Sequence, residues 1–256
     1  MSFIFRLTVF FLLLTLVLGC APRVVPVERP PEAVWNEFRS GIVEFPPEQS
    51  FLISASVTFI TPGQRNRVQS TLWGRIGYPI RMDLSAGFGQ TIAMWSEDEH
   101  FWEAYFPGEN IKYLHHDGSM GASILGYPTA LDLRQTARVL LGAFDELIPE
   151  NFHEVRSYNG MWEYYFQDHD VRSMIIAQDG SVSSITGQGW MVELSARRDE
   201  ESFRYYSRID MQLSEKERAL IRIRSIRIDD QQWDEDQLVL NIPPDAEIVY
   251  LPGFSM

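Results

Sequence analysis

The side chains that could bind a metal ion are concentrated in one short segment, the His-His-Asp run at 115–117. Imidazole and carboxylate groups are common ligands of divalent metals. The run ends a predicted β-strand, in which adjacent side chains point to opposite faces of the sheet, so one ion cannot easily contact both histidines. We interpret these residues as structural or solvated, together with the scattered His100, His153 and His169, and we predict no metal site.

The other residues that could do chemistry are two charged clusters and a glycine-flanked segment. The acidic stretch SEDEH (96–100) could attract a cation, but its position favours a solvated hairpin tip. Arg222, Arg224 and Arg227 are typical of the solvent-facing side of a strand. The segment GFGQT (87–91) is similar to half of a nucleotide-binding loop, but no helix is predicted after it.

Common catalytic motifs are missing from the sequence. It contains no G-x-S-x-G elbow, no H-E-x-x-H pair and no glycine-rich phosphate loop. A lipid-modifying hydrolase would need a nucleophile and a base in contact, and the sequence offers no candidate pair. We therefore predict a protein that is not an enzyme, has no catalytic residues and needs no cofactor.

One covalent modification is predicted, at the single cysteine. Residues 1–19 hold one basic residue, Arg6, followed by an uncharged apolar run that is too short to span a membrane, which is the layout of an export signal. The next residues, Val17-Leu18-Gly19-Cys20, resemble the lipobox of bacterial lipoproteins. The resemblance implies cleavage before Cys20, diacylglycerol on its thiol and an acylated amino terminus. An ordinary cleaved signal with an incidental thiol is the alternative.

The charge and the segment after Cys20 restrict where the protein acts. Residues 20–31 are rich in proline and predict a semi-extended tether between the lipid anchor and the domain. The net charge of −13 disfavours nucleic acid and anionic lipid as electrostatic partners. Several acyl chains would hold the protein permanently on a membrane. Because Ala21 and not aspartate follows Cys20, the usual sorting convention favours the periplasmic face of the outer membrane.

The remaining chain, 32–256, reads as a single mainly β domain. PEAVWNEFRSG (31–41) predicts a short helix, and the period changes to two from residue 51, with Ile53, Ala55, Val57 and Phe59 on one face. Turn residues then recur at the spacing of an antiparallel meander, including Asn159-Gly160 and Asp179-Gly180. One longer helix is predicted over 131–148, stopped by Pro149. A β-bulge is predicted near Arg224–Ser225, and a final strand pair is predicted on either side of Pro243-Pro244.

These elements predict one long curled antiparallel sheet with two helices to cover it. Two helices cannot fill the hollow of so many strands, so we expect an apolar cavity that is only partly filled. Methionine suits a cavity that adapts to varied ligands. The candidate lining residues are Phe59, Trp73, Met82, Met94, Trp95, Leu140, Phe144 and Met211.

The order of lipobox, tether, short helix, meander, central helix and further hairpins resembles the LolA/LolB lipoprotein-localisation superfamily. The best local matches are PIRMDLSAGFGQTIAMW (79–95) and LRQTARVLLGAFDELIP (133–149). The resemblance implies an incomplete, half-open antiparallel β-barrel of about eleven strands, with helices covering its mouth and acyl chains inside. It also implies a loop between two early strands that inserts an apolar side chain into the bilayer, here Gly87, Phe88 and Gly89. A Phe88 ring that folds back onto the core is an equal alternative.

The expected function follows from these features together. We predict a monomeric, outer-membrane lipoprotein that holds acyl chains of lipoproteins or lipid, and that receives cargo from a LolA-like periplasmic carrier. A scaffolding lipoprotein that binds an envelope protein through a sheet edge or its acidic face is the alternative. A large open cavity would favour the first reading, and a filled interior would favour the second.

Overall fold

The computed structural model describes residues 29–87, 89–200, 203–229 and 232–254. Cys20 and Phe88 therefore lie outside the described residues, as do the predicted signal and most of the predicted tether. Within the described ranges the helices are α2 (Pro31–Ser40), α3 (Gly118–Ile124), α4 (Leu133–Leu141) and α5 (Glu235–Leu238). The strands are β1 (Ser50–Thr61), β2 (Gln64–Arg75), β3 (Ile80–Ser85), β4 (Thr91–Glu97), β5 (Trp102–Phe106), β6 (Ile111–His115), β7 (Glu154–Tyr158), β8 (Met161–Tyr165), β9 (Val171–Ile176), β10 (Val182–Gly187), β11 (Met191–Asp199), β12 (Arg204–Ser214), β13 (Glu217–Asp229) and β14 (Glu247–Tyr250).

The fourteen strands of the described ranges form one sheet, in the order β14-β6-β5-β4-β3-β2-β1-β13-β12-β11-β10-β9-β8-β7. Neighbouring strands are antiparallel, except for β14, which runs parallel to β6. The two edge strands, β14 and β7, do not pair with each other, so the sheet stays open. The mainly β, half-open architecture is thereby confirmed, although the sheet has more strands than the eleven that the resemblance implied.

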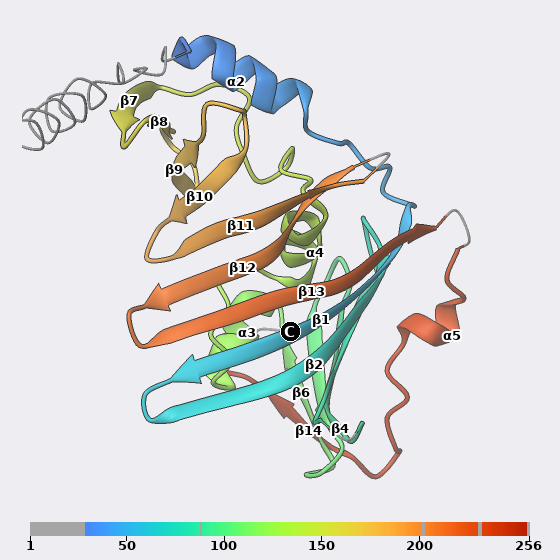
Figure 1. Ribbon diagram of the computed structural model, residues 1–256. Coiled ribbons are helices and arrows are strands. Elements are labelled where there is room, and N and C mark those ends of the chain that lie inside the picture. The colour runs from blue at the N-terminus through green and yellow to red at the C-terminus, as the bar shows by residue number, and fades with distance from the viewer. Residues whose placement is uncertain (1–28, 88, 201–202, 230–231, 255–256) are drawn as a thin grey trace, which may run out of the picture.

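The sheet curls around α4, as Figure 1 shows with the strands in front and α3 and α4 behind them. Helix α4 contacts β12 on one side and β3 and β4 on the other, although three strands separate β12 from β3 in the sheet. Helix α3 packs on β5 and β6, and α2 packs on β9. The helices therefore lie on the concave face, where the curled sheet leaves its apolar side chains to be covered.

The predicted N-terminal helix is confirmed as α2. Proline stands at its first position, where no backbone N–H is needed, and Gly41 follows its last residue. Val34, Trp35 and Phe38 form the buried stripe. The Trp35 ring lies 5.0 Å from that of Tyr164 on β8, so the helix closes the end of the sheet formed by β7 to β10.

The alternation that predicted β1 also holds in the structure. Ile53, Ala55 and Val57 are buried toward the concave face. The predicted bulge in β13 is confirmed, because Ser54 pairs with Ser225 while the next residue, Ala55, pairs with Ile223. Arg224 is the extra residue that lets the inward-facing side chains change register.

The central helix is shorter than predicted, and this corrects the expected range 131–148. Helix α4 begins with a capping box between Asp132 and Gln135 and ends at Leu141, because Gly142 takes a left-handed conformation with φ of 73°. A Cβ atom on Gly142 would lie 1.9 Å from the carbonyl oxygen of Arg204 in β12. The helix therefore stops where its backbone meets the sheet, seven residues before Pro149.

The C-terminal region differs most from the sequence prediction. Of the predicted strand pair around Pro243-Pro244, only β14 forms, beside β6. The first half instead contains α5, where Asp234 and Gln237 form a capping box. Leu238 and Leu240 are buried, so this segment covers part of the outer face of the sheet. Helix α3 was also missed, because its GSMGASI sequence carries few strong helix formers.

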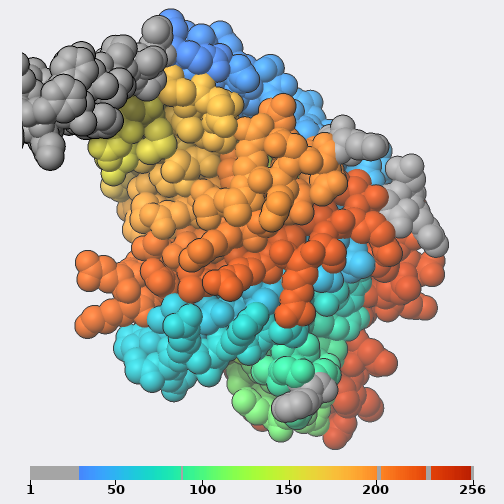
Figure 2. All heavy atoms as spheres, in the orientation of Figure 1, coloured from blue at the N-terminus to red at the C-terminus, as the bar shows by residue number. Residues whose placement is uncertain are grey.

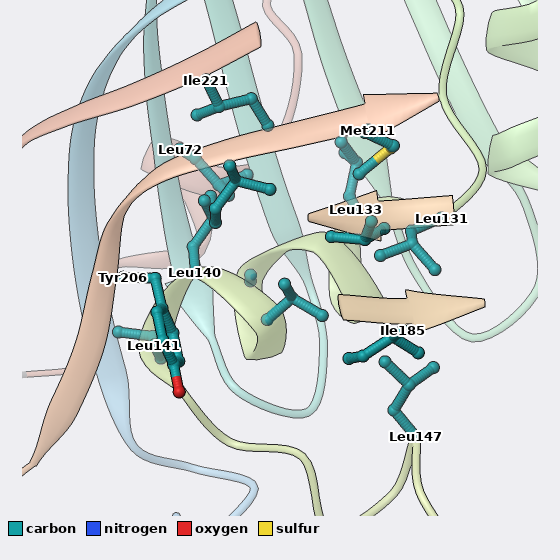
Figure 3. Packing of buried hydrophobic residues seen from close by; sticks show 14 of the residues in the cluster. Leu72, Leu131, Leu133, Leu140, Leu141, Leu147, Ile185, Tyr206, Met211 and Ile221 are labelled. Atoms are coloured by element: carbon teal, nitrogen blue, oxygen red, sulfur yellow. The ribbon is translucent and has the colours of Figure 1, made fainter. Parts of the chain in front are cut away.

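The hydrophobic core fills the space between the concave face and the helices. In Figure 3, Leu140 and Leu141 of α4 lie among side chains of the strands, with Tyr206 of β12 beside Leu141. The hydroxyl of Tyr206 accepts a hydrogen bond from the backbone N–H of Val182 at 2.6 Å. The opposite, outer face of β1, β2, β12 and β13 is turned to the viewer in Figure 2.

Candidate functional site

An apolar cavity of about 50 Å³ lies between the concave face of the sheet and the short helices. Its floor comes from β1, β3, β4, β5, β12 and β13, and its cover from α3, the segment 125–132 and α4. Leu131, Leu133 and Met211 lie close together at this cover in Figure 3. The complete lining is Val57, Phe59, Met82, Trp95, Trp102, Gly118, Ala122, Thr129, Leu131, Leu133, Thr136, Met211, Ala219 and Ile221.

Aromatic rings join the cover to the floor. The Tyr127 ring, in the cover, stands edge-on to Phe59 at 5.0 Å and to Trp95 at 4.9 Å between ring centroids. Trp95 in turn contacts Trp102 at 5.4 Å. Such edge-to-face pairs add about 1 kcal/mol each beyond the area that they bury. Burial also raises the pKa of the Tyr127 hydroxyl, so the ring stays neutral at the boundary of the cavity.

No ionisable side chain lines this cavity among the described residues. The two threonines of the lining are its polar members, and Thr129 donates a hydrogen bond to the carbonyl oxygen of Leu131 at 2.7 Å. The Met211 sulfur lies 3.2 Å from the backbone N–H of Ala130, which fixes the cover to β12. The cavity is thus suited to an apolar group and offers nothing to a charged one.

Six of the eight candidate lining residues face the core, and four of them line the cavity. Phe59, Met82, Trp95 and Met211 contribute to its wall. Leu140 is buried in α4 and packs elsewhere in the core, beside Leu72 in Figure 3. Phe144 is also buried, and its ring lies 6.2 Å from that of Phe38 in α2, away from this cavity.

The other two candidates, Trp73 and Met94, correct the prediction because they lie on the outer face. The Trp73 indole donates to the carbonyl oxygen of Gln237 at 3.3 Å, and the Met94 sulfur lies 3.3 Å from the Arg81 guanidinium. Met94 and Trp95 are adjacent in one strand, so only one of them can face the cavity. The α5 segment covers Trp73, and both outer residues are half-buried, which alternation alone did not reveal.

Glu97 is the residue that the sequence prediction placed wrongly. It was expected in a solvated hairpin tip, but only 4% of its surface is exposed. It ends the inward series Ala93, Trp95, Glu97 of β4, and this alternation is the signal that could have located it. Its carboxylate accepts a hydrogen bond from the backbone N–H of Leu133, the first residue of α4, at 2.9 Å. The Tyr78 hydroxyl lies 3.4 Å from the other carboxylate oxygen.

Burial raises the pKa of Glu97 to about 8, and the nearby negative charge of Asp132 adds to this effect. The pKa of Asp132 is raised as well, chiefly by burial. The Glu97 carboxyl is therefore mostly protonated at neutral pH. A Cβ atom on Gly118 would lie 2.5 Å from a Glu97 oxygen, so the start of α3 also closes over this carboxyl.

An acidic cleft of about 680 Å³ borders the apolar cavity on the outside of the cover. Gly118 and Leu131 line both the cavity and the cleft, and Glu97 lines the cleft. His116 and Asp117 line the cleft, whereas His115 is buried, with its ring nitrogens 2.7 Å from the Asp117 carbonyl oxygen and 3.2 Å from that of Pro252. No three histidine, cysteine or acidic side chains of the described ranges are grouped as a metal ion would need.

The glycine-flanked turn between β3 and β4 projects from the sheet. The N–H of Ala86 donates to the carbonyl oxygen of Gln90 at 2.8 Å, and Gly89 has φ of 81°. Gly87 and Gly89 are exposed, and a Cβ atom on either would meet nothing within 4 Å. The turn therefore leaves room for a side chain at its tip; Phe88 itself lies outside the described residues. Across the part of the chain that is described, no helix has the length and apolarity to cross a membrane.

Comparison with solved structures shows which known proteins have a similar fold. A LolA superfamily protein from Nitrosomonas europaea superimposes with a TM-score of 0.51 at 8% sequence identity, covering 82% of this chain and 97% of that protein. The chain has the fold of the LolA superfamily. A domain from Vibrio parahaemolyticus, provisionally named as an outer membrane lipoprotein-sorting protein, shares this LolA-like fold with a TM-score of 0.50 at 9% identity and coverage of 80% and 94%.

A third solved structure is similar to this chain to the same extent. A DUF1329 family protein from Desulfovibrio piger superimposes with a TM-score of 0.50 at 10% identity, covering 82% of this chain and 99% of that protein. No protein-family model and no curated protein matches the sequence. At these identities the comparisons define the architecture, and the function has to be argued from the cavity.

Proposed function

We propose that this protein binds lipid acyl chains in the apolar cavity and, as an outer-membrane lipoprotein, helps to receive or insert other lipoproteins. The observation that carries the proposal is an aromatic and aliphatic cavity beneath a cover of short helices in a LolA-like fold. Burying apolar surface there is favourable, at roughly 25 cal/mol per Å². The binding needs no covalent chemistry and no cofactor.

The cavity is not the large open space that was expected of a carrier, so the cover has to move when an acyl chain enters. One water molecule takes up about 30 Å³ of liquid volume, so a cavity of about 50 Å³ holds only a few atoms. Helix α3 is suited to such movement because it packs on the Trp102 ring through Gly118 and Gly121, which have no side chains to interlock. Its apolar residues Met120 and Ile124 are exposed at the surface of the cover.

The membrane location in this proposal rests on the sequence. The lipobox at 17–20 supports attachment through acyl chains on Cys20, and Ala21 supports the outer membrane. The predicted tether to residue 31 leads directly into α2, at the end of the sheet opposite β14. The proposal therefore has a monomer on the periplasmic face that takes cargo from a LolA-like carrier.

A cavity-filling substitution tests acyl-chain binding. Ala219 of β13 lies in the cavity wall opposite Phe59 and Met211, so Ala219→Leu should fill the space. We expect it to weaken binding of palmitate by about tenfold or more, the equivalent of about 1.4 kcal/mol. Quenching of tryptophan fluorescence measures the binding, because Trp95 and Trp102 line the cavity.

The matched control is Ser225→Leu, which adds a leucine to the same strand at an exposed position. It should bind palmitate as the wild type does. Equal binding by the wild type and Ala219→Leu would remove the cavity as the binding site. No binding of palmitate by the wild type would instead support the scaffolding alternative, in which the filled interior is only a core.

The glycine-flanked turn gives a second test, of membrane delivery. The exposed turn supports a projecting Phe88, whose burial in lipid contributes about 2 kcal/mol. Phe88→Glu should leave the thermal unfolding midpoint unchanged and should reduce transfer of an acylated lipoprotein into vesicles in a reconstituted assay. Phe88→Leu, which keeps an apolar side chain, is the control. Unchanged transfer by Phe88→Glu would exclude this role.

A further inference from the structure

The outer face of the sheet carries a basic hollow that the cavity does not explain. It measures about 210 Å³ and lies across β1, β2 and β13, on the face that Figure 2 turns to the viewer. Its lining contains no carboxylate, although the chain has 35 acidic and 22 basic residues. The lining residues are Ser56, Thr58, Arg65, Arg67, Leu220 and Arg222.

The register of the strands places like charges together at this hollow. Arg222 pairs directly with Arg208 across β13 and β12, and with Ser56 across β1. Like charges directly opposite each other destabilise an antiparallel pair. Neither Arg65, Arg67 nor Arg222 forms an ion pair with another described residue. Asp210 interacts electrostatically with Arg208, so the charges that remain available to an external anion are those of Arg65, Arg67 and Arg222.

Two acidic side chains of the neighbouring strands on this face interact with other residues. Asp210 of β12 pairs with Arg218 at 3.5 Å. Glu193 of β11 accepts a hydrogen bond from Gln212 at 3.4 Å. Neither residue lines the hollow, so its positive charge is not cancelled from within the sheet.

The hollow also offers hydrogen-bond donors in a fixed arrangement. The Arg67 Nε atom donates to the Ser56 hydroxyl at 2.8 Å, which holds the guanidinium over β1. Thr58 lies between Arg67 and Leu220 in the register, so a second hydroxyl faces the same space. Guanidinium groups bind phosphate oxygens in pairs, and hydroxyls can supply further bonds.

We propose that this hollow binds a phosphate group, either of a lipid headgroup or of a soluble phosphate. A tetrahedral phosphate, with at least one negative charge and acceptor oxygens in several directions, matches a hollow lined by three guanidinium groups better than a single planar carboxylate does. The site lies on the opposite side of the sheet from the apolar cavity, so it is independent of acyl-chain binding. The hollow is a local region of positive charge, on a protein of net negative charge, to which an anionic ligand can bind.

Calorimetric titration of the full-length chain tests the site with two probes at constant ionic strength. The probes are inorganic phosphate and dihexanoyl phosphatidylglycerol, which is soluble below its micelle concentration. The variant Arg65→Gln/Arg67→Gln/Arg222→Gln should bind at least about tenfold more weakly to each probe that the wild type binds. The control Arg156→Gln/Arg172→Gln/Arg198→Gln changes the net charge equally at exposed positions of β7, β9 and β11, and should bind as the wild type does.

The outcomes distinguish a lipid headgroup from a soluble phosphate as the ligand, and they show when the proposal fails. Binding of both probes, lost in the first variant alone, supports a site for the phosphate group itself. Binding of the lipid alone, with the same loss, supports a headgroup site. Binding that the first variant retains, a loss that the control shares, or no binding by the wild type would overturn the proposal. Circular dichroism confirms that each variant is folded, and palmitate binding remains as a separate test of the cavity.

Discussion

Replacing Gly142 by alanine is expected to lower the free energy of unfolding by about 4 kcal/mol or more. Gly142 has φ of 73°, which costs a residue with a Cβ atom about 1 kcal/mol. The larger cost is steric, because the new Cβ atom would lie 1.9 Å from the carbonyl oxygen of Arg204. Neither partner can rotate away, since both belong to the backbone. The end of α4 would have to leave β12.

Urea unfolding followed by circular dichroism measures this change, with Gly126→Ala as the matched control. Gly126 also follows a helix and has φ of 84°, but a Cβ atom there would meet nothing within 4 Å. The control should therefore lose only about 1 kcal/mol. If the two variants were equally stable, the close approach of α4 to β12 would not be what holds the helix in place.

Gly142 also shows why the helix boundary could not be predicted from the sequence. Pro149 is a strong local stop signal, and the apolar stripe continues to Phe144, so periodicity favoured a longer helix. The actual end is set by a contact with Arg204, which lies far along the chain. By contrast, the start of the helix and the bulge at Arg224 depend on local patterns, and both were predicted near their observed places.

The same distinction applies to the candidate site. Alternation in β1 and β12 identified Phe59 and Met211 as cavity residues, because a strand buried on one face exposes the other. It failed for Trp73 because the α5 segment covers the outer face there, and it failed for Met94 because this outward side chain lies against Arg81. Glu97 was missed because a charged residue among acidic neighbours is typical of a turn, and this outweighed the inward alternation Ala93, Trp95, Glu97 that continues to its burial under α3 and α4.

Glu97 is expected to make the stability of the protein fall as the pH rises through neutrality. The pKa of its carboxyl is about 4.5 in the unfolded chain and about 8 in the fold. Between these values the folded state keeps the proton and the unfolded state has lost it. The free energy of unfolding therefore decreases with pH in this window, by at most about 1.4 kcal/mol per pH unit, and levels off above pH 8.

Glu97→Gln should remove this slope, because an amide of the same shape still accepts the hydrogen bond from Leu133 and does not ionise. The difference in free energy of unfolding between the variant and the wild type should therefore grow in favour of the variant from pH 5 to pH 8. Each kcal/mol of this difference raises the unfolding midpoint of the variant by about 2–4 °C. Thermal unfolding at several pH values measures the gain. Glu99→Gln, an exposed change in the same acidic stretch, should leave the slope unaltered.

The outcome also bears on how the cavity opens. Ionised Glu97 would place a second negative charge beside Asp132, under the start of α4 and against Gly118 of α3. Both helices belong to the cover, so the wild type should exchange the amide hydrogens of residues 118–135 faster at pH 9 than Glu97→Gln does, after correction for intrinsic exchange. Equal protection in the two proteins at pH 9 would mean that this carboxyl stabilises the core without governing access to the cavity.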